Sequence, residues 1–387
     1  MDRYVYGEVD RCLMPVDNRE IVRYYMTHLA VAHTRRARLR YWVRGKPAFR
    51  STCRFGASKS SEHLAAFLRD HGPQFFEGTP LRDDPHLDWL VLADHPQSGR
   101  SRVVAFPFAP GSARPRAVLK LCPTAAGRGG SLEREWEALR YLDERLPHGL
   151  RDTLPRALAY HRLGAFEALL QTHCRGRAMY VDLSRHVFPR RLVRRHLRTA
   201  ARWLAEFHLA TREAERTIDA GVLEESLGGA NAPPRLGEML SRNPIRFSAG
   251  HGDYWARNLL QRVDRSDEAA SVDPSGVVDW ESFRRQAPPW EDLFFFALSY
   301  GMNYPWSGYH RLPAEDSFRR TFIEENDVSR EVRRYFAVYC ARTAIPWDLL
   351  EPLLHLHLMR APRAPDRDPW PGCRELLSRT GPSVFTR

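Results

Sequence analysis

Lysine is nearly absent from this sequence of 387 residues, because all but three of its 59 basic side chains are arginines. Its six cysteines are scattered without a C-x-x-C pair, so we expect reduced thiols and not a disulfide framework or a zinc site. The sequence has no run of about 18 or more apolar residues, and no membrane-spanning helix is predicted. The sequence starts with Met1-Asp2-Arg3-Tyr4, which has an acidic residue at its second position and lacks the apolar core of a signal peptide. We therefore expect a cytoplasmic protein.

Positive charge is concentrated at the start of the chain. Residues 1–60 contain 13 Lys and Arg against 5 Asp and Glu, which is +8 of the net +12, whereas residues 61–173 contain 14 of each. We predict that residues 1–85 form an added α+β subdomain, with a helix over residues 18–33 and a hairpin over residues 37–55 that has one basic face. This face could bind an anionic partner, although a solvated arginine-rich surface is the alternative. Few aromatic residues lie among these charges, so nucleic-acid binding is not favoured.

The most informative segment combines Asp253 with Asn258 and, after a predicted hairpin, Asp279. An Asp, an Asn five residues later and a second Asp form the set that phosphoryl transfer requires. Asp253 would orient the attacking hydroxyl and take its proton, whereas Asn258 and Asp279 would bind Mg²⁺ on the phosphates of ATP. Short strands are predicted around these residues, at 245–249, 259–263 and 276–278, so that both acids lie where strands end. The alternative is that the two are ordinary turn acids.

A second component of such a site is predicted upstream. Lys120 lies in an apolar strand over residues 116–121, where a lysine is costly to bury without a partner. We expect it to contact the α- and β-phosphates, and the alternative is an edge-strand lysine whose ammonium reaches solvent. The helix predicted over residues 131–142 should supply a glutamate that pairs with Lys120. Glu135 is the favoured partner and Glu133 is the rival.

A nucleotide also needs strands over its phosphates and a hinge for its base. The strands predicted over residues 88–92 and 102–108 would cover the phosphates, although the turn between them contains only one glycine, Gly99. The strand over residues 166–174 is predicted to enter the hinge. It carries the residues expected to lie at the adenine, and Leu260 would form the floor beneath it or simply pack in the core. These hinge residues are Gln171, His173 and Cys174.

These motifs resemble the aminoglycoside phosphotransferase/choline kinase-like superfamily, whose members are small-molecule kinases with a protein-kinase-like fold. The resemblance extends from about Trp89 to Tyr300, and it rests on five matched pieces: Leu119-Lys120, Arg134-Glu135, the 251–258 loop, Asp279-Trp280-Glu281 and the 288–293 segment. It implies a bilobal α+β fold, with a small β-rich N-lobe over residues 86–174 and a helical C-lobe over residues 175–387, behind the added N-terminal subdomain.

The resemblance also implies roles that are structural and not catalytic. Asp292 would brace the active-site loops, and His251 would hold the loop backbone instead of transferring protons. The sequence departs from the family pattern at Tyr254-Trp255 and in its glycine-poor phosphate turn. These departures put the family's adenine and phosphate contacts in question more than its chemistry.

The acceptor pocket is predicted among the helices after residues 190 and 291. This region has no surplus of acid, so a polycationic aminoglycoside is not favoured, whereas aromatic side chains suited to stacking on sugars are plentiful. Arg257 could steady the transferring phosphoryl group or lie in solvent. Candidate acceptor contacts are Trp255, Glu281, Tyr300, Tyr304 and Trp306.

The sequence therefore predicts a kinase that uses Mg²⁺ and ATP to phosphorylate a hydroxyl of a small molecule, most readily a sugar-containing metabolite or a natural product such as an antibiotic. A protein kinase is disfavoured, because too few residues separate Asp279 from residue 288 for a long activation loop. The remaining alternative is a catalytically inactive pseudokinase, either a nucleotide-binding or a regulatory interaction module. Against it, all five residues of the expected site are chemically intact.

Overall fold

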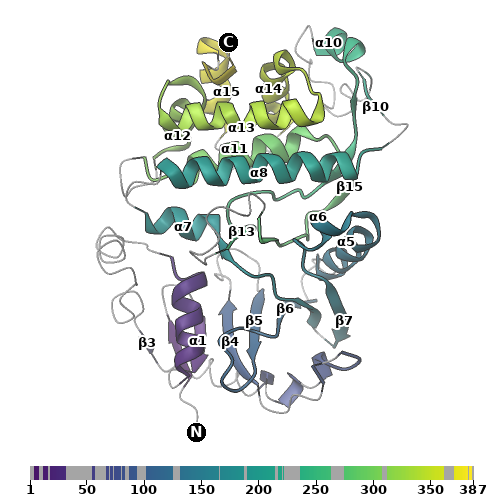
Figure 1. The fold of residues 1–387 in the computed structure, drawn as a ribbon, viewed down its shortest axis with the longest axis vertical. Helices are drawn as coiled ribbons and strands as arrows, with labels where there is room; N and C mark the ends of the chain where they lie inside the picture. The colour runs from purple at the N-terminus through teal and green to yellow at the C-terminus, as the bar shows by residue number, and fades with distance from the viewer. Residues whose placement is uncertain are drawn as a thin grey trace.

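The chain folds into a β-rich lobe and a helical lobe, which lie one above the other in Figure 1. The computed structural model describes residues 4–7, 12–15, 18–31, 55–56, 67–68, 70–72, 74–79, 81–82, 87–93, 102–124, 131–164, 166–186, 190–213, 217–219, 221, 236–262, 274–306, 312–360, 370–381 and 383–385. The predicted hairpin over residues 37–55 and the turn at Gly99 fall almost entirely outside these residues.

The β-rich lobe contains one eight-stranded sheet in which every pairing is antiparallel. Its strand order is β3-β1-β2-β4-β5-β6-β8-β7. The strands from the first 56 residues thus extend the sheet that contains Lys120. In chain order the strands are β1 (Tyr4–Gly7), β2 (Cys12–Pro15), β3 (Phe55–Gly56), β4 (Asp88–Ala93), β5 (Val103–Phe108), β6 (Ala117–Pro123), β7 (Ala157–Leu163) and β8 (Phe166–Thr172).

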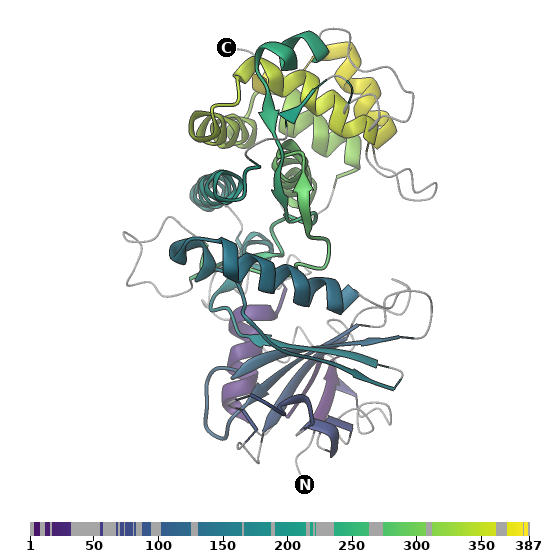
Figure 2. The same cartoon turned by 90° about the vertical axis from the view of Figure 1, so that its right-hand side faces the viewer.

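Strand register defines two faces of this sheet. Val104 pairs with Lys120 and Leu92 pairs with Val104, so these side chains share one face, which we call the Lys120 face. The opposite face carries Leu119 and its neighbours, which pack against aromatic side chains of residues 67–79. Helix α5 (Ser131–Arg145) lies between the sheet and the helical lobe, as Figure 2 shows, and supplies Glu135 to Lys120.

A helix from the start of the chain also packs on the Lys120 face. It consists of α1 (Arg19–Tyr24) and the π-helical turn η1 (Tyr25–Leu29), together called the α1–η1 helix. Asn18 caps it, because the side-chain oxygen accepts hydrogen bonds from Glu20 N at 3.1 Å and Ile21 N at 3.2 Å. The predicted helix over residues 18–33 is therefore present, but it ends at Leu29 because the backbone at Ala30 is extended.

The helical lobe is built around α8 (Arg190–Ala210), α11 (Trp290–Asn303) and α13 (Asp327–Thr343), which contribute much of its continuous core. Its other helical segments are α6 (His148–Arg151), α7 (Met179–Arg185), α10 (Leu236–Arg242), α12 (Ala314–Phe318), η4 (Arg319–Ile323), η5 (Trp347–Leu349), α14 (Leu350–Arg360), α15 (Trp370–Thr380) and η6 (Ser383–Phe385). No helix among the described residues is both long enough and apolar enough to span a bilayer.

Short strands of the helical lobe carry the motif residues. They form three small sheets, and the strands predicted near residues 245, 259 and 276 are all present. The pairs are β10 (Thr217–Ile218) with β11 (Ile245–Arg246), β12 (Ser248–Gly250) with β15 (Arg284–Ala287), and β13 (Leu259–Gln261) with both β14 (Gly276–Val277) and β9 (Arg177–Ala178). The predicted bilobal, kinase-like α+β fold is confirmed, whereas the division at residues 85 and 174 stays a proposal.

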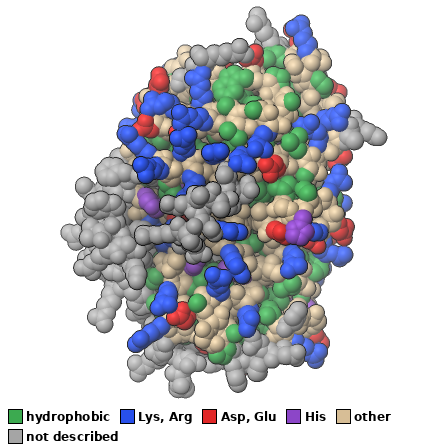
Figure 3. Space-filling model, viewed as in Figure 1, with side chains coloured by type: hydrophobic (Ala, Val, Ile, Leu, Met, Phe, Trp, Pro, Cys, Tyr) green, Lys and Arg blue, Asp and Glu red, His purple; other side chains and the backbone are tan. Residues whose placement is uncertain are grey.

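The arginine-rich composition is visible on the surface. On the face drawn in Figure 3, Lys and Arg side chains are distributed over both lobes, with acidic side chains among them. The basic hairpin face expected at residues 37–55 lies outside the described residues, so its proposed anionic partner stays a proposal.

Candidate functional site

The two motif turns are brought together by the pairing of β13 with β14. Leu259 pairs with Val277, and Val278 N donates to Asn258 O at 2.9 Å. Asp253 and Asn258 lie on the loop between β12 and β13, and Asp279 follows β14. Both acids therefore lie where short strands end, as the sequence predicted.

Asp253 is held by the amide of Asn258. Asn258 Nδ2 donates to Asp253 Oδ2 at 3.0 Å and to Asp253 O at 2.9 Å. Burial raises the pKa of the Asp253 carboxyl, the charge of Asp279 raises it further, and together they outweigh the lowering effects of His251 and Asn258. A carboxylate with a raised pKa is a better proton acceptor than an ordinary surface Asp.

The loop that carries Asp253 is braced by Asp292 at the start of α11. Its two carboxylate oxygens accept hydrogen bonds from His251 N at 2.6 Å and Gly252 N at 2.9 Å. His251 Nε2 lies 3.1 Å from Val278 O, and its Nδ1 lies 3.2 Å from the backbone nitrogen of Asp253. Both ring nitrogens are thus engaged with the backbone, in agreement with the structural roles expected for Asp292 and His251.

Lys120 and Glu135 form a buried ion pair. Lys120 Nζ donates to the two carboxylate oxygens of Glu135 at 2.6 and 2.8 Å, and to Asp279 Oδ1 at 2.9 Å. The predicted pairing with Glu135 is confirmed, and the rival Glu133 instead pairs with Arg162 at the surface. Burial lowers the pKa of Lys120, but the two carboxylates outweigh it and the pKa is raised, so the ammonium is charged.

Asp279 combines an unusual backbone conformation with a carboxyl whose pKa is lowered. Its φ of 69° lies in the left-handed region, which non-glycine residues rarely adopt. Burial alone would raise the pKa of its carboxyl, but the charges of Lys120 and Arg102 lower it well below the usual range. Asp279 is therefore ionised, as a ligand for a cation must be.

Arg102 is a site residue that sequence reasoning missed. It precedes β5, and its guanidinium contacts Asp279 Oδ1 at 3.1 Å and also pairs with Glu281. Glu281 was expected to contact an acceptor, and here it is engaged by Arg102. The available signal was the position of Arg102 at the start of a strand predicted to cover the phosphates, where a cation would be useful.

Asn258 and Asp279 form a donor set that fits Mg²⁺. The amide oxygen of Asn258 is not used by its bonds to Asp253, and Asp279 Oδ2 is not used by its ion pairs with Lys120 and Arg102. Mg²⁺ prefers oxygen ligands and is commonly held by one or two protein groups together with phosphates and waters. Among the described residues no group of three or more His, Cys, Asp or Glu gathers around a common point.

The residues predicted to contact a base lie on the Lys120 face and in the hinge. Gln171 pairs with Val118, is 2% exposed, and its Oε1 has no hydrogen-bond partner among the described residues. An orphaned, buried acceptor of this kind suits a ligand that presents an N–H group. Cys174 follows in the hinge, and burial raises the pKa of its thiol to about 12, so it is uncharged.

Leu260 of β13 and Cys174 of the hinge both lie close to Gly276. A Cβ atom at Gly276 would come within 2.7 Å of Cys174 Cβ and 3.0 Å of Leu260 Cδ1. The absence of a side chain at Gly276 therefore allows the hinge and β13 to approach it closely. Leu260 itself is only partly buried. This position is compatible with the proposed floor of a base pocket.

The aromatic candidates for acceptor binding divide into two groups. Tyr300 is 0% exposed and its hydroxyl lies 3.1 Å from His196 Nδ1, so it packs in the lobe core and cannot meet an acceptor as expected. Helix α11 has buried residues on several of its faces, so its sequence lacks the polar face by which a helix that lines a pocket could be recognised. Tyr304 and Trp306 follow that helix, remain half-buried and contact each other with ring centroids 4.8 Å apart.

Arg257 is exposed within the 251–258 loop. Its guanidinium lies over the rings of Tyr180, at 4.7 Å, and Trp255, at 5.3 Å. These contacts fix the side chain by cation–π attraction. Its proposed contact with a phosphoryl group therefore requires it to leave this stack.

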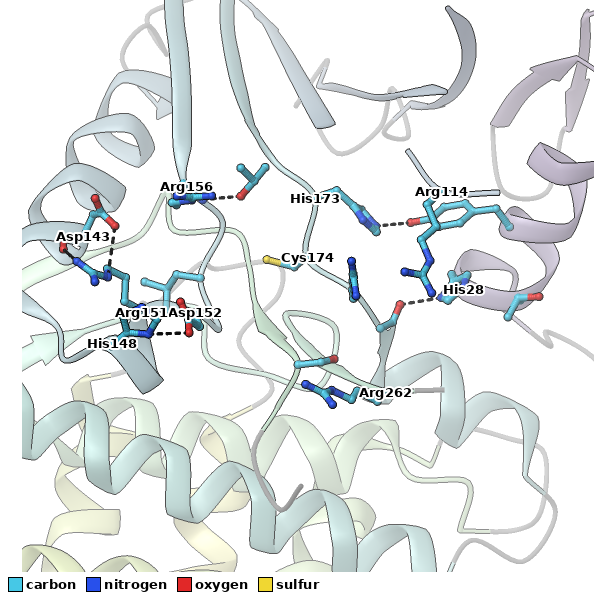
Figure 4. Close-up of a pocket in the computed structure, with 17 residues that line it drawn as sticks. His28, Arg114, Asp143, His148, Arg151, Asp152, Arg156, His173, Cys174 and Arg262 are labelled. Carbon is cyan, nitrogen blue, oxygen red and sulfur yellow. Dashed lines mark hydrogen bonds and ion pairs between the residues drawn. The ribbon is translucent and has the colours of Figure 1, made fainter. Parts of the chain in front are cut away.

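A cavity of about 900 Å³ runs along hinge residues 172–176 (Figure 4). Its lining includes His28 on one side and Arg156 on the other, and the hydrogen bonds of His173 and His28 join lining residues on the His28 side. Lys120, Asp253 and Asp279 are not among its lining residues. The cavity is therefore distinct from the cluster of ionised groups between the lobes.

Comparisons with known proteins give structural matches only. No protein-family model matches the sequence, and no curated protein matches it. Among 59 matching chains of solved structures is aminoglycoside phosphotransferase APH(3'')-Id from Streptomyces rimosus, at 16% identity and a TM-score of 0.42, with 79% of this chain and 99% of that chain covered. A structure of the same enzyme with ADP and streptomycin matches at 17% identity and a TM-score of 0.41, covering 68% and 93%.

An aminoglycoside-3'-phosphotransferase of type VIII also matches, at 16% identity and a TM-score of 0.34, with 64% of this chain and 88% of that chain covered. All three are aminoglycoside phosphotransferases. This is the group whose motifs the sequence resembles.

Proposed function

We propose that this chain is a phosphotransferase that moves the γ-phosphoryl group of ATP to a hydroxyl group of a small molecule, with Mg²⁺ as the metal. One observation carries the proposal. Lys120 and Glu135 from the β-rich lobe and Asp279 from the helical lobe form one hydrogen-bonded cluster, and the loop with Asp253 and Asn258 pairs with the strand that leads to Asp279. Residues 159 positions apart in the chain thus assemble the charges that phosphoryl transfer needs.

The cationic side of the site would bind the phosphates. Lys120 is charged and is aimed by Glu135, so it offers a fixed ammonium to phosphate oxygens. Arg102 lies beside it and shares Asp279 Oδ1. When phosphates engage these two cations, the carboxylate of Asp279 would need a new partner, and Mg²⁺ would supply it.

The acceptor hydroxyl would be oriented by Asp253. Its carboxylate is fixed by Asn258, and its raised pKa suits it to accept the hydroxyl proton late in transfer. Asn258 and Asp279 would hold Mg²⁺, which neutralises charge on the phosphates when bound. Positioning of the two reactants supplies most of the catalysis in this class of reaction.

The short connection after Asp279 supports a small-molecule acceptor. Only β15 separates Asp279 from α11, and β15 is paired with β12. This span therefore has no room for the long loop on which protein kinases dock a polypeptide. Half-buried Tyr304 and Trp306 offer aromatic surface suited to a sugar-containing metabolite or a natural product, an antibiotic included.

The test is consumption of ATP by the purified protein with Mg²⁺, against a panel of sugars, nucleosides, aminoglycosides, macrolides and amino alcohols. Asp253→Ala should lower kcat by about 10²–10⁴-fold, because the positioned base is lost. Its dissociation constant for ATP should change little. Asp316→Ala, a partly exposed acid on α12, is the matched control and should behave as the unchanged protein does.

Near-normal turnover by Asp253→Ala would show that the assigned role is wrong. If no member of the panel is phosphorylated and no Mg²⁺-dependent ATP binding is measured, the chain is better described as a pseudokinase or an interaction module. Turnover with one acceptor class would identify the substrate.

A further inference from the structure

Strand register locates where the base of a nucleotide would lie. If phosphates bind Lys120 and the base binds the hinge after Thr172, the nucleotide must run along the Lys120 face between them. Val118 lies on that path, because it is two residues before Lys120 and pairs with Gln171 just before the hinge. By the continuing register, Phe106 of β5 lies beside Val118 on the same face. These two side chains would form the roof over a base.

The α1–η1 helix already covers this roof. Val118 is 9% exposed and Phe106 is 8% exposed, because they pack in one cluster with Ile21, Tyr24 and Tyr25. An open nucleotide cleft would leave such roof residues facing solvent or ligand. Here the apolar face of the helix takes that place.

Tyr24 of this helix contacts both the roof and the hinge. Its ring centroid lies 6.1 Å from that of Phe106, 5.3 Å from that of Phe108 and 5.7 Å from that of His173 in the hinge. Its hydroxyl lies within hydrogen-bond distance, 2.7 Å, of His173 Nε2 (Figure 4). An aromatic ring between the roof and the hinge, with a polar edge on the hinge, is the arrangement by which adenine would bind.

The helix is also anchored to the helical lobe. Arg185 of α7 is 1% exposed, and its guanidinium donates to Met26 O at 2.8 Å, Thr27 O at 2.8 Å and Ala30 O at 3.0 Å. These are the carbonyls left without partners at the end of η1, which a buried cation satisfies well. His28 adds a contact of 2.8 Å from its Nδ1 to Gly176 O at the far end of the hinge (Figure 4).

We propose that the nucleotide face of the sheet has two mutually exclusive ligands, namely the base of ATP and the chain's own α1–η1 helix. In this structure the helix is bound, so the conformation is an autoinhibited one in which the phosphate and metal residues are assembled but the base site is filled. The inference rests on the proposed function, because it concerns regulation of the same site. A ligand or partner that withdraws the helix would activate the enzyme.

Competition of this kind has a defined thermodynamic consequence. The apparent dissociation constant of a ligand rises in inverse proportion to the fraction of protein that can bind it. A helix that is bound in about nine molecules of ten raises the apparent dissociation constant for ATP about tenfold. Loosening the helix must therefore tighten ATP binding, which is the opposite of what loss of a binding residue does.

The first experiment measures the dissociation constant for ATP with Mg²⁺ by calorimetry, on the full chain and two variants. At that occupancy Tyr24→Ala should bind ATP up to about tenfold more tightly, because the helix loses its contacts with the roof and the hinge. Arg23→Ala is the matched control. Arg23 is the preceding residue on the same helix, its side chain is 71% exposed, and its substitution should leave ATP binding unchanged.

If Tyr24→Ala fails to fold, Tyr24→Phe keeps the ring and removes only the contact with His173. One hydrogen bond corresponds to a gain of about twofold to tenfold in affinity for ATP. Weaker ATP binding by either variant would overturn the inference and make Tyr24 part of the nucleotide site.

The second experiment needs no variant. Hydrogen exchange of the amides of residues 18–30 is compared without ligand and with saturating Mg²⁺ and ATP, and it should become faster as the helix is displaced. ATP binding with unchanged or slower exchange there would overturn this inference and leave the proposed function intact. If neither the unchanged protein nor a folded Tyr24→Ala variant binds ATP, both the inference and the proposed function fail.

Discussion

Gly252 is the residue whose substitution tests the geometry of the candidate site most directly. It lies between His251 and Asp253 with φ of 78°, and a Cβ atom there would come 2.2 Å from Ser282 O, a backbone atom of the neighbouring turn. Gly252→Ala therefore introduces two separable penalties. One is the left-handed backbone conformation, and the other is overlap with an atom that no side-chain rotation can relieve.

The two penalties differ in what they affect. A left-handed alanine costs about 1–2 kcal/mol of stability wherever it stands. The overlap must in addition be relieved by moving the 251–258 loop away from Ser282, and contacts closer than 3.0 Å are essentially never seen, so the movement is about 0.8 Å or more. A misplacement of about 1 Å near reacting groups costs about 10²-fold in rate. We expect kcat to fall by about that factor.

Gly111 supplies the matched control. Its φ of 71° is close to that of Gly252, but no atom lies within 4 Å of the position its Cβ would take. Gly111→Ala should lose about 1–2 kcal/mol in urea denaturation with kcat unchanged, whereas Gly252→Ala should lose both stability and turnover. Equal kcat values for the two variants would refute the role assigned to the loop.

Two further predictions concern ionised groups of the site. Glu135→Gln should lower the free energy of unfolding by up to about 3–5 kcal/mol and weaken ATP binding, because it removes the carboxylate of a buried ion pair and leaves Lys120 paired with Asp279 alone. Urea denaturation measures the loss of stability, and calorimetry measures the loss of affinity. Glu133→Gln, at the surface of the same helix, is the control and should change both little. Because the folded-state pKa of Asp253 is raised, its charge destabilises the fold at neutral pH and folding gains stability as pH falls through that pKa. Asp253→Asn should therefore unfold at the same or a higher urea concentration at pH 7 while turnover is lost, and the acid limb of the kcat/KM profile of the unchanged protein should lie above the ordinary Asp pKa of about 3.9. An acid limb at the ordinary Asp pKa, together with an Asp253→Asn variant that is less stable than the unchanged protein, would contradict the raised pKa assigned to Asp253.

Local spacing was sufficient to predict which polar residues lie together between the lobes. Helical periodicity placed Glu135 on the face that meets Lys120, and strand endings placed Asp253 and Asp279 on the turns that the pairing of β13 with β14 brings together. The bracing role of Asp292 came only from the resemblance to a family, since nothing in the spacing joins residue 292 to residue 251. The bilobal fold was likewise an implication of that resemblance, which these motifs carry.

Long-range packing could not be predicted in the same way. Amphipathic spacing predicted a helix from Asn18, but it could not show that the helix covers Val118, because no local pattern encodes that partner. The four-residue strands β1 and β2 are too short for an alternating pattern to distinguish them from a loop. Tyr300 was misassigned for a related reason, since an aromatic residue in a helix buried on several sides looks the same in sequence as one that lines a pocket.

The early position of the α1–η1 helix also sets the order in which this protein can fold during synthesis. Tyr24 contacts His173, 149 residues later, and the helix end contacts Arg185, so its partners leave the ribosome well after it does. At typical synthesis rates that interval is on the order of ten seconds, during which the apolar side of the helix has no surface to pack on. We therefore expect that the α1–η1 helix is buried only after β8 and α7 are complete. Conditions that slow synthesis should accordingly lower the yield of folded protein by prolonging that exposure.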